Sequence, residues 1–267
     1  MRLPALFALV LTAMAVPAAA HDFWIDLPSY RAVPGATLPV RLLIGDTGAA
    51  EPWEVLWRKI VSLRSFGPGG VIDHQASIRP TTATDPGGAS VTLTQPGTHI
   101  VAFESYQAES DLPAAEFNPY AEHEGLTPAI AQRRRDGTTE MRGRELYSRR
   151  AKAIVQVGDR LTDDAIRPIG QTLEIVPEAN PYGLVASQPL VVRILYRGRP
   201  LAGASVTLEP LDGPTQHMMP VVTDGQGRAT FAFAKRGRWR IATVWTQPID
   251  HPRAEFDTIF ASLTFGY

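Results

Sequence analysis

Short segments in which apolar and polar residues alternate recur along most of this chain, separated by turns that contain glycine or proline. One begins after the Pro-Gly turn of "YRAVPGATLPVRLL", with Leu38, Val40 and Leu42 at every second position. In the last segment, "FDTIFASLTFGY", the residues of one face are Ile259, Ala261, Leu263 and Phe265. A period of two is typical of a half-buried β-strand. The 22 glycines and 23 prolines are spread along the chain and provide frequent turns. The sequence therefore predicts an all-β fold.

The strand pattern falls into two groups, which predict two immunoglobulin-like β-sandwich domains. The first sandwich is expected over residues 21–165 and the second over residues 171–267. Within the first, "QPGTHIVAFES" resembles the Pro-Gly turn and long strand that come late in immunoglobulin-like sandwiches.

A segment rich in helix formers interrupts the first group at about residues 110–148. It contains "LPAAEFNPYAEHEGL" and "TPAIAQRRRDG", where Thr127 and Pro128 form an N-cap and first-turn pair. The following "GRELYSRRAKAIVQVG" is expected to begin as helix and to become a strand from about Lys152. The sequence thus predicts a helical insertion in the first sandwich.

The first 20 residues have the pattern of a cleaved signal peptide. Arg2 precedes an apolar run over residues 3–16, and Ala18 and Ala20 provide the small residues that signal peptidase accepts. The alternative is an uncleaved N-terminal anchor. Cleavage would make His21 the first residue of a mature protein, exported most naturally to the periplasm.

Composition excludes several classes of function. The 27 acidic and 26 basic residues nearly cancel, which gives no electrostatic case for binding nucleic acid or an anionic membrane. No second long apolar run follows the leader, so no membrane span is expected after cleavage, and the absence of cysteine means that folding needs no disulfide. The motifs GxSxG and HExxH and a glycine-rich phosphate loop are also absent, and we predict a binding protein rather than an enzyme.

A histidine at the first position could chelate a metal ion. Its α-amine, with a pKa of about 8, and its imidazole can bind the same ion. A second histidine would complete a set of three nitrogens, which suits Cu(II) or Ni(II) in a tetragonal field. The alternative is that His21 merely begins an edge strand.

The insertion is expected at the same end of the sandwich as His21, because the first strand begins where the penultimate strand ends. Its "AEHEG" motif makes His123 the preferred second ligand, with Glu122 or Glu124 as a carboxylate ligand or hydrogen-bond partner. The alternative is that this motif is a solvated helix face.

The remaining histidines are weaker candidates. His74 is expected in a surface loop, and His99 is expected to have a structural role at the opposite end from His21.

Basic residues are also concentrated in and after the insertion. They are Arg133, Arg134, Arg135, Arg142, Arg144, Arg149 and Arg150. This cluster could receive an anionic ligand or a partner protein. Alternatively, these arginines neutralise nearby acidic residues, such as Glu140 and Glu145, on solvent-exposed helix faces.

Several separate strings resemble the exported DUF4198 proteins, which are similar to the substrate-binding NikM component of nickel and cobalt uptake systems. These strings are "AHDFW", "LPAAEFNPYAEHEGL", "GRELYSRRAKAIV", "LEIVPEANPYGL", "ILYRGRPLAGASV", "TDGQGRATF" and "FASLTFGY". The resemblance implies periplasmic metal handling or uptake. NikM-type components retain membrane segments and place a histidine second after the initiator methionine, so nickel specificity does not transfer directly to His21.

Together these observations predict a periplasmic accessory protein that binds a divalent transition metal, either nickel, cobalt or copper. The candidate partners are a membrane transporter or an outer-membrane receptor. Two alternatives belong to other classes. One is a copper-dependent oxidoreductase with a site like a histidine brace, and the other is a protein-interaction module without metal.

Overall fold

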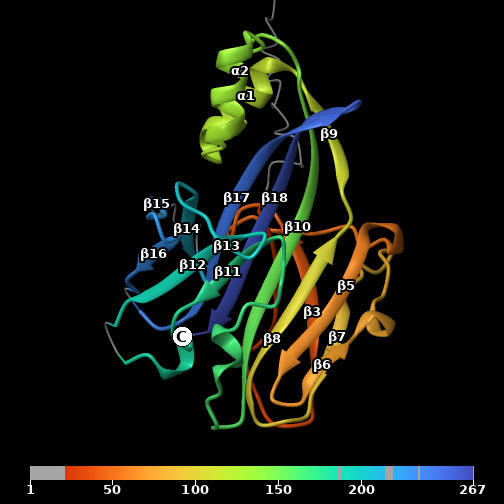
Figure 1. Ribbon diagram of the computed structural model, residues 1–267. Coiled ribbons are helices and arrows are strands. Elements are labelled where there is room, and N and C mark those ends of the chain that lie inside the picture. Colours follow the sequence, from red (N-terminus) through yellow and green to blue (C-terminus); the bar gives the residue numbers. More distant parts are fainter. Residues whose placement is uncertain (1–21, 186–187, 214–218, 234, 267) are drawn as a thin grey trace, which may run out of the picture.

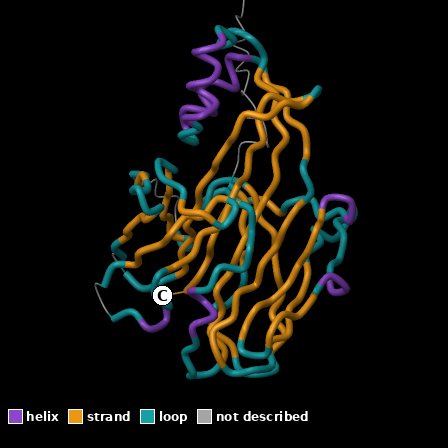
Figure 2. Tube along the Cα trace, in the orientation of Figure 1, coloured by secondary structure: helices purple, strands orange, loops and turns teal. Residues whose placement is uncertain are grey.

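β-Strands form most of the regular structure. The computed structural model describes residues 22–185, 188–213, 219–233 and 235–266. The strands lie in three sheets, and two α-helices project beyond the strands at one end of the molecule (Figure 1). The tube view shows the same division, with a long body of strands below the helical pair (Figure 2). The predicted all-β class is confirmed.

The central sheet has ten strands in the order β15-β14-β17-β18-β10-β8-β5-β6, with β2 and β9 also paired to β10. Its strands are β2 (Arg31–Ala32), β5 (Ile60–Gly67), β6 (Gly70–Asp73), β8 (Gly97–Ser105), β9 (Ala108–Leu112), β10 (Gly143–Val157), β14 (Ser205–Pro210), β15 (Val221–Val222), β17 (Arg238–His251) and β18 (Ala254–Gly266). The first small sheet contains β1 (Phe23–Asp26), β3 (Ala36–Ile44), β4 (Glu51–Pro52) and β7 (Ala89–Leu93). The second contains β11 (Leu173–Pro177), β12 (Leu190–Tyr196), β13 (Arg199–Pro200) and β16 (Arg228–Phe231). The short 3₁₀-helices are η2 (Trp57–Lys59), η3 (Gln75–Ser77), η4 (Asp163–Ile166) and η5 (Pro181–Gly183).

Strand β10 belongs to both halves of the molecule. Successive side chains of a strand point to opposite faces of its sheet. Ala151, Ala153 and Val155 lie in a core with the first small sheet, whereas Ile154 lies in a core with the second. The two small sheets therefore cover opposite faces of the central sheet.

The central sheet runs without interruption from one half to the other. The connection is the parallel pairing of β10 with β18, in register from Glu145 with Phe256 to Ala153 with Thr264. The predicted inward face of the last strand is confirmed, since its residues all lie in the second core. They are Ile259, Ala261, Leu263 and Phe265.

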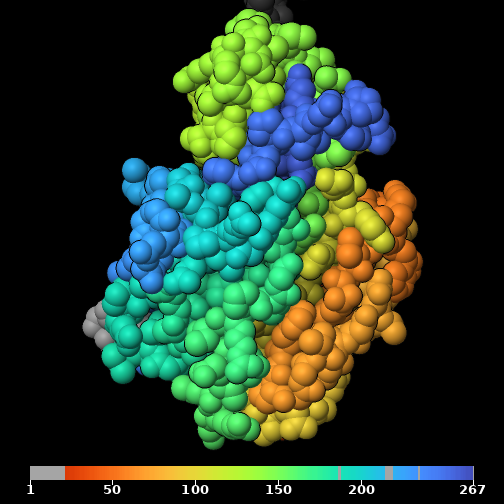
Figure 3. All heavy atoms as spheres, viewed as in Figure 1, coloured from red at the N-terminus to blue at the C-terminus, as the bar shows by residue number. Residues whose placement is uncertain are grey.

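The insertion forms a pair of helices, α1 (Ala114–His123) and α2 (Thr127–Asp136), over the ends of β17 and β18 (Figure 3). The expected helical start of the segment after Arg142 is wrong, because β10 is a strand from Gly143 onward, paired with β9 and β18. Thr127 is the first helical residue rather than the N-cap, which is Leu126. Within the described ranges, no helix has the length and apolar character that crossing a membrane requires.

Candidate functional site

Two arginines of β17, in the central sheet, form ion pairs with aspartates in and next to strand β1 of the first small sheet. Arg238 and Arg240 are two residues apart on β17 and therefore share a face. A nitrogen of Arg240 donates to Asp22 Oδ2 at 2.6 Å, and Arg238 Nη1 lies 3.5 Å from Asp26 Oδ1. These contacts fix both the end of β1 and the residue just before it.

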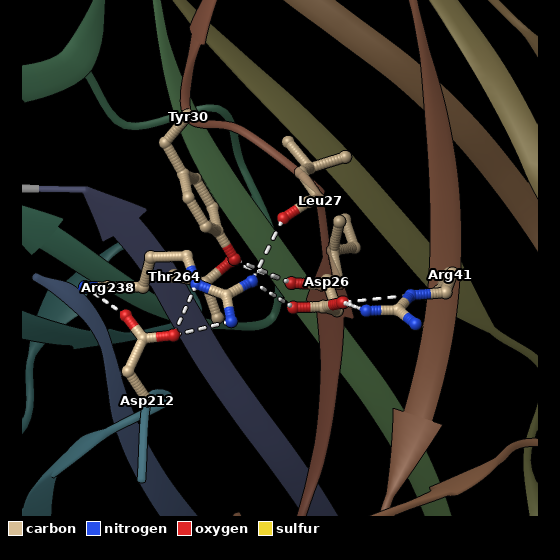
Figure 4. A network of polar contacts seen from close by, with 8 residues as sticks. Asp26, Leu27, Tyr30, Arg41, Asp212, Arg238 and Thr264 are labelled. Atoms are coloured by element: carbon tan, nitrogen blue, oxygen red, sulfur yellow. Dashed lines mark hydrogen bonds and ion pairs between the residues drawn. The ribbon is translucent and has the colours of Figure 1, made fainter.

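The contact at Asp26 is part of a polar network (Figure 4). Arg41 Nε donates to Asp26 Oδ2 at 2.9 Å, and Arg238 Nε donates to Asp212 Oδ1 at 2.8 Å. The hydrogen bond from Arg238 lowers the pKa of Asp212, while burial raises the pKa of the nearby Tyr30 hydroxyl. Since each charge has an opposite partner, we interpret this network as a structural clamp.

Arg240 occupies a more deeply buried position than Arg238. Its side chain is 1% exposed, and its guanidinium lies 4.4 Å from the centre of the Trp24 ring. Besides Asp22, it donates to Glu209 Oε2 at 2.7 Å. One buried cation is thus shared by two carboxylates, which offset the cost of burying it.

The turn between α1 and α2 approaches the same region. Gly125 has φ +67°, and a Cβ there would lie 2.9 Å from the Ser205 Cβ on β14. Only glycine adopts this backbone conformation readily and leaves the space for this approach. The close contact places the preceding Glu124 near the residues around Arg240.

Glu124 is half-buried, and its pKa is raised well above the usual range. Burial is the largest cause, followed by the negative charge of Asp22, while Arg240 acts in the opposite direction. Asp46 adds further negative charge. The raised pKa reflects above all the burial of this carboxylate, and a cation beside it would favour its ionised form.

Of the four predicted metal ligands, the structure places only Glu124 close to Asp22 and Arg240. His21 lies outside the described residues, and its neighbour Asp22 is the first that the structure describes. Glu122 and His123 are solvent-exposed near the end of α1, and Glu124 is the member of the motif whose pKa responds to Asp22. Among the described residues, no group of three or more histidine, aspartate, glutamate or cysteine side chains could by itself hold a metal ion.

Sequence reasoning missed Arg240 and Glu209. A usable signal was present, because "RWRIATVW" alternates arginine with large apolar residues over Arg238 to Ile241. Since one face of this strand fills a core, an arginine on its other face must either reach solvent or find an acid. The alternation does not indicate which acid, since Asp22 is 218 residues away in the sequence.

Two other histidines have structural roles. The expected surface position of His74 is wrong, because it is 9% exposed and its Nε2 lies 2.8 Å from Ser65 Oγ. His99 is buried, and its Nε2 lies 2.8 Å from the Gln95 carbonyl oxygen.

Glu145 is a buried acid beneath the helical pair. Thr258 Oγ1 donates to its Oε2 at 2.7 Å, and the Tyr120 hydroxyl donates to the same atom at 3.5 Å. Burial raises the pKa of Glu145 to about 7, although both hydrogen bonds favour the ionised form and lower it.

We expect this carboxyl to make folding stability depend on pH. The folded state binds the proton of Glu145 more tightly than the unfolded state, whose pKa is close to the ordinary 4.5. Its stabilising contribution is fully present below about pH 4.5 and is lost as the pH rises through about 7. The change in the free energy of unfolding is about 3 kcal/mol. Urea unfolding across this range should show a smaller pH dependence for Glu145→Gln than for the wild type, and identical profiles would contradict the assignment.

Comparison with the profiles of protein families gives a match. The profile of the family described as "Domain of unknown function (DUF4198)" matches residues 18–247, a range that includes Asp22, Glu124 and Arg240. A search of curated proteins finds no match to the chain.

Proposed function

Because this chain belongs to the DUF4198 family, whose description assigns no activity, we propose a function from the chain's own residues. The protein is an exported accessory protein of the periplasm that binds a divalent transition metal during metal uptake or handling. It binds the ion and passes it on, without catalysing a reaction. Export and cleavage before His21 are part of the proposal.

The proposed ligands are the amine and imidazole of His21, the imidazole of His123 and a carboxylate from Glu124 or Glu122. Glu124 is favoured over Glu122, because it is half-buried whereas Glu122 is exposed, and its pKa is raised by burial and then by the charge of Asp22. The described residues lack a complete ligand set of their own, so tight binding depends on the nitrogens of His21.

The observation that carries the proposal is the half-buried carboxylate of Glu124 close to Asp22 and Arg240, beside the predicted mature N-terminus. Asp22 is held by Arg240 and by the amide of Gly45, which donates to its carbonyl oxygen at 3.0 Å. The proposed chelating residue directly precedes this anchored position in the sequence. A metal bound to His21 would favour the ionised form of Glu124, which burial disfavours.

The cargo is nickel, cobalt or copper. A chelate of amine and imidazole nitrogens favours Cu(II) or Ni(II), and the proposed similarity to NikM-type uptake components favours nickel or cobalt. The proposed partner is a membrane transporter or an outer-membrane receptor. As part of the same proposal, the two halves of the chain are interpreted as immunoglobulin-like sandwiches.

The test compares two forms of the protein that differ at the N-terminus. One begins at His21, as verified by mass spectrometry, and the other retains Ala20. Titration with Ni(II), Co(II), Cu(II) and Zn(II) should show binding to the first form that is weakened about 100-fold or more in the second. Equal affinity in both forms would reject the terminal chelate.

Substitutions in the form that begins at His21 identify the other ligands. Glu124→Gln and His123→Ala should each weaken binding by at least about 10-fold. Glu116→Gln, on the exposed face of α1, is the matched control and should leave the affinity unchanged. If Glu122→Gln weakens binding and Glu124→Gln does not, the assignment of the carboxylate is wrong.

A further inference from the structure

A cavity of about 260 Å³ lies among η2, the turn between β8 and β9, and β10. Three cationic and three aromatic side chains line it. They are Arg58, Lys59, Arg149, Trp53, Tyr106 and Tyr147. Aspartate and glutamate are absent from the described residues of its lining. The cavity is thus both cationic and aromatic.

Arg149 is the deepest of the three cations. It is 4% exposed, and its guanidinium carbon lies 4.9 Å from the ring centre of Tyr147, 5.5 Å from that of Phe260 and 5.7 Å from that of Phe23. Its Nε has no hydrogen-bond partner among the residues that the structure describes. The aromatic rings offset only part of the cost of burying this charge.

Arg149 also differs from its neighbours in lacking a close counter-ion. Lys59 Nζ lies 2.6 Å from Glu54 Oε2, and Arg150 Nε lies 3.5 Å from Glu104 Oε2. Within the described part of the chain, Arg149 forms no ion pair. Burial lowers its pKa, while the Tyr147 hydroxyl opposes this most and Tyr120 and Glu145 oppose it less. A buried cation that is not directly paired is expensive, and an anion in the cavity would relieve that cost.

We infer that this cavity binds a small organic acid, with its carboxylate on Arg149 and its apolar body between the aromatic side chains. A guanidinium recognises a carboxylate through paired N–H groups. Trp53 is 7% exposed, and Tyr106 at the edge is 58% exposed, so the lining offers apolar area as well as charge. Ligand pockets commonly exceed about 300 Å³, and this smaller volume suits a compact ligand.

Benzoate is a suitable probe, with benzyl alcohol as the neutral analogue and inorganic phosphate as an anion without an apolar body. Calorimetric titration of the full chain in EDTA keeps the measurement independent of the proposed metal site. Benzoate should bind about 10- to 100-fold more tightly than benzyl alcohol, because a charge-assisted hydrogen bond is lost with the alcohol. Phosphate should bind more weakly than benzoate.

Variants locate the binding site. Arg149→Lys and Arg149→Met should each weaken benzoate binding by about 10-fold or more. Arg144→Met changes a partly exposed arginine of the same strand outside the cavity and should have no effect. If Arg149→Met does not fold, Tyr106→Ala and Arg58→Met, both at exposed positions of the lining, should still reduce the affinity.

Four outcomes would overturn the inference. They are no binding of benzoate up to about 10 mM, well above a weak millimolar Kd; equal binding of benzyl alcohol; phosphate binding as tight as benzoate binding; and unchanged affinity in the folded variants of the lining.

Discussion

Replacing Lys152 with methionine should lower the free energy of unfolding by about 3–5 kcal/mol. Lys152 and Glu174 form a buried ion pair with side chains 1% and 2% exposed, and Lys152 Nζ donates to Glu174 Oε1 at 3.0 Å. Burial lowers the pKa of Lys152, but the adjacent carboxylate favours its charged form. Methionine fills a similar volume but leaves the charge of Glu174 in the core without a counter-ion.

The position of this pair explains the large expected effect. Lys152 lies on β10, the strand shared by both cores, and Glu174 lies on β11 of the second small sheet. The carboxylate of Glu174 also accepts hydrogen bonds from the amides of Ile169 and Gly170, at 2.7 and 3.0 Å. These residues belong to the segment that connects the two halves. Loss of the pair would therefore loosen the second small sheet from the central sheet.

Urea unfolding measures the effect, and a second substitution tests its cause. Adding Glu174→Gln to Lys152→Met removes the unpaired charge and should restore more than about 1 kcal/mol. Arg79→Met, which breaks the exposed pair of Arg79 and Asp85, is the control and should cost less than about 1 kcal/mol. If Lys152→Met lowers the free energy of unfolding no more than this control does, the ion pair does not stabilise the contact between β10 and β11.

Replacing Phe117 with alanine should be similarly destabilising, by about 3–5 kcal/mol. Phe117 is completely buried, and its ring centre lies 5.8 Å from that of Phe256 in a stacked arrangement. The guanidinium carbon of Arg133 lies 4.9 Å from the same ring centre. A Cβ on Gly143 would lie 2.2 Å from the ring, so the side chain rests directly on the backbone of β10. One ring thus joins α1, α2, β10 and β18.

Loss of this ring should affect the helical pair first. Hydrogen exchange of residues 114–136 should accelerate more than exchange in the central strands, because local unfolding needs less free energy than global unfolding. Urea unfolding gives the overall effect. Glu116→Ala, at the exposed neighbouring position, should change stability by less than about 0.5 kcal/mol. If Phe117→Ala lowers the free energy of unfolding by less than about 1 kcal/mol, the packing of this ring does not stabilise the pair of helices.

The sequence could not show which of the arginines after the helical insertion are buried and which are exposed. In the sequence they form a single basic cluster, open either to an anionic ligand or to neutralisation by nearby acids. The structure separates them: Arg144 is near Glu255 at a partly exposed position, while Arg149 is buried beneath aromatic rings. Which arginine faces a cavity depends on how β10 packs against segments distant in the chain.

Local pattern was sufficient for the class of fold. Alternation along each strand is a property of neighbouring residues, so the all-β class and the inward face of Ile259 to Phe265 followed directly from it. It failed at residues 143–148, where Arg144, Glu145 and Leu146 favour a helix but lie in a strand. Their pairing with β9 and β18 satisfies the backbone and outweighs their weak helical preference.

The sequence by itself determined that the chain forms many short strands, and it drew attention to the motif of Glu122, His123 and Glu124. Only the tertiary structure decided that β10 is shared by two cores, that Glu124 is half-buried whereas Glu122 is exposed, and that Arg240 binds both Asp22 and Glu209. These are pairings between residues far apart in the chain, and they depend on strand register and on which faces pack together. Neither register nor packing is encoded in the period of any single segment.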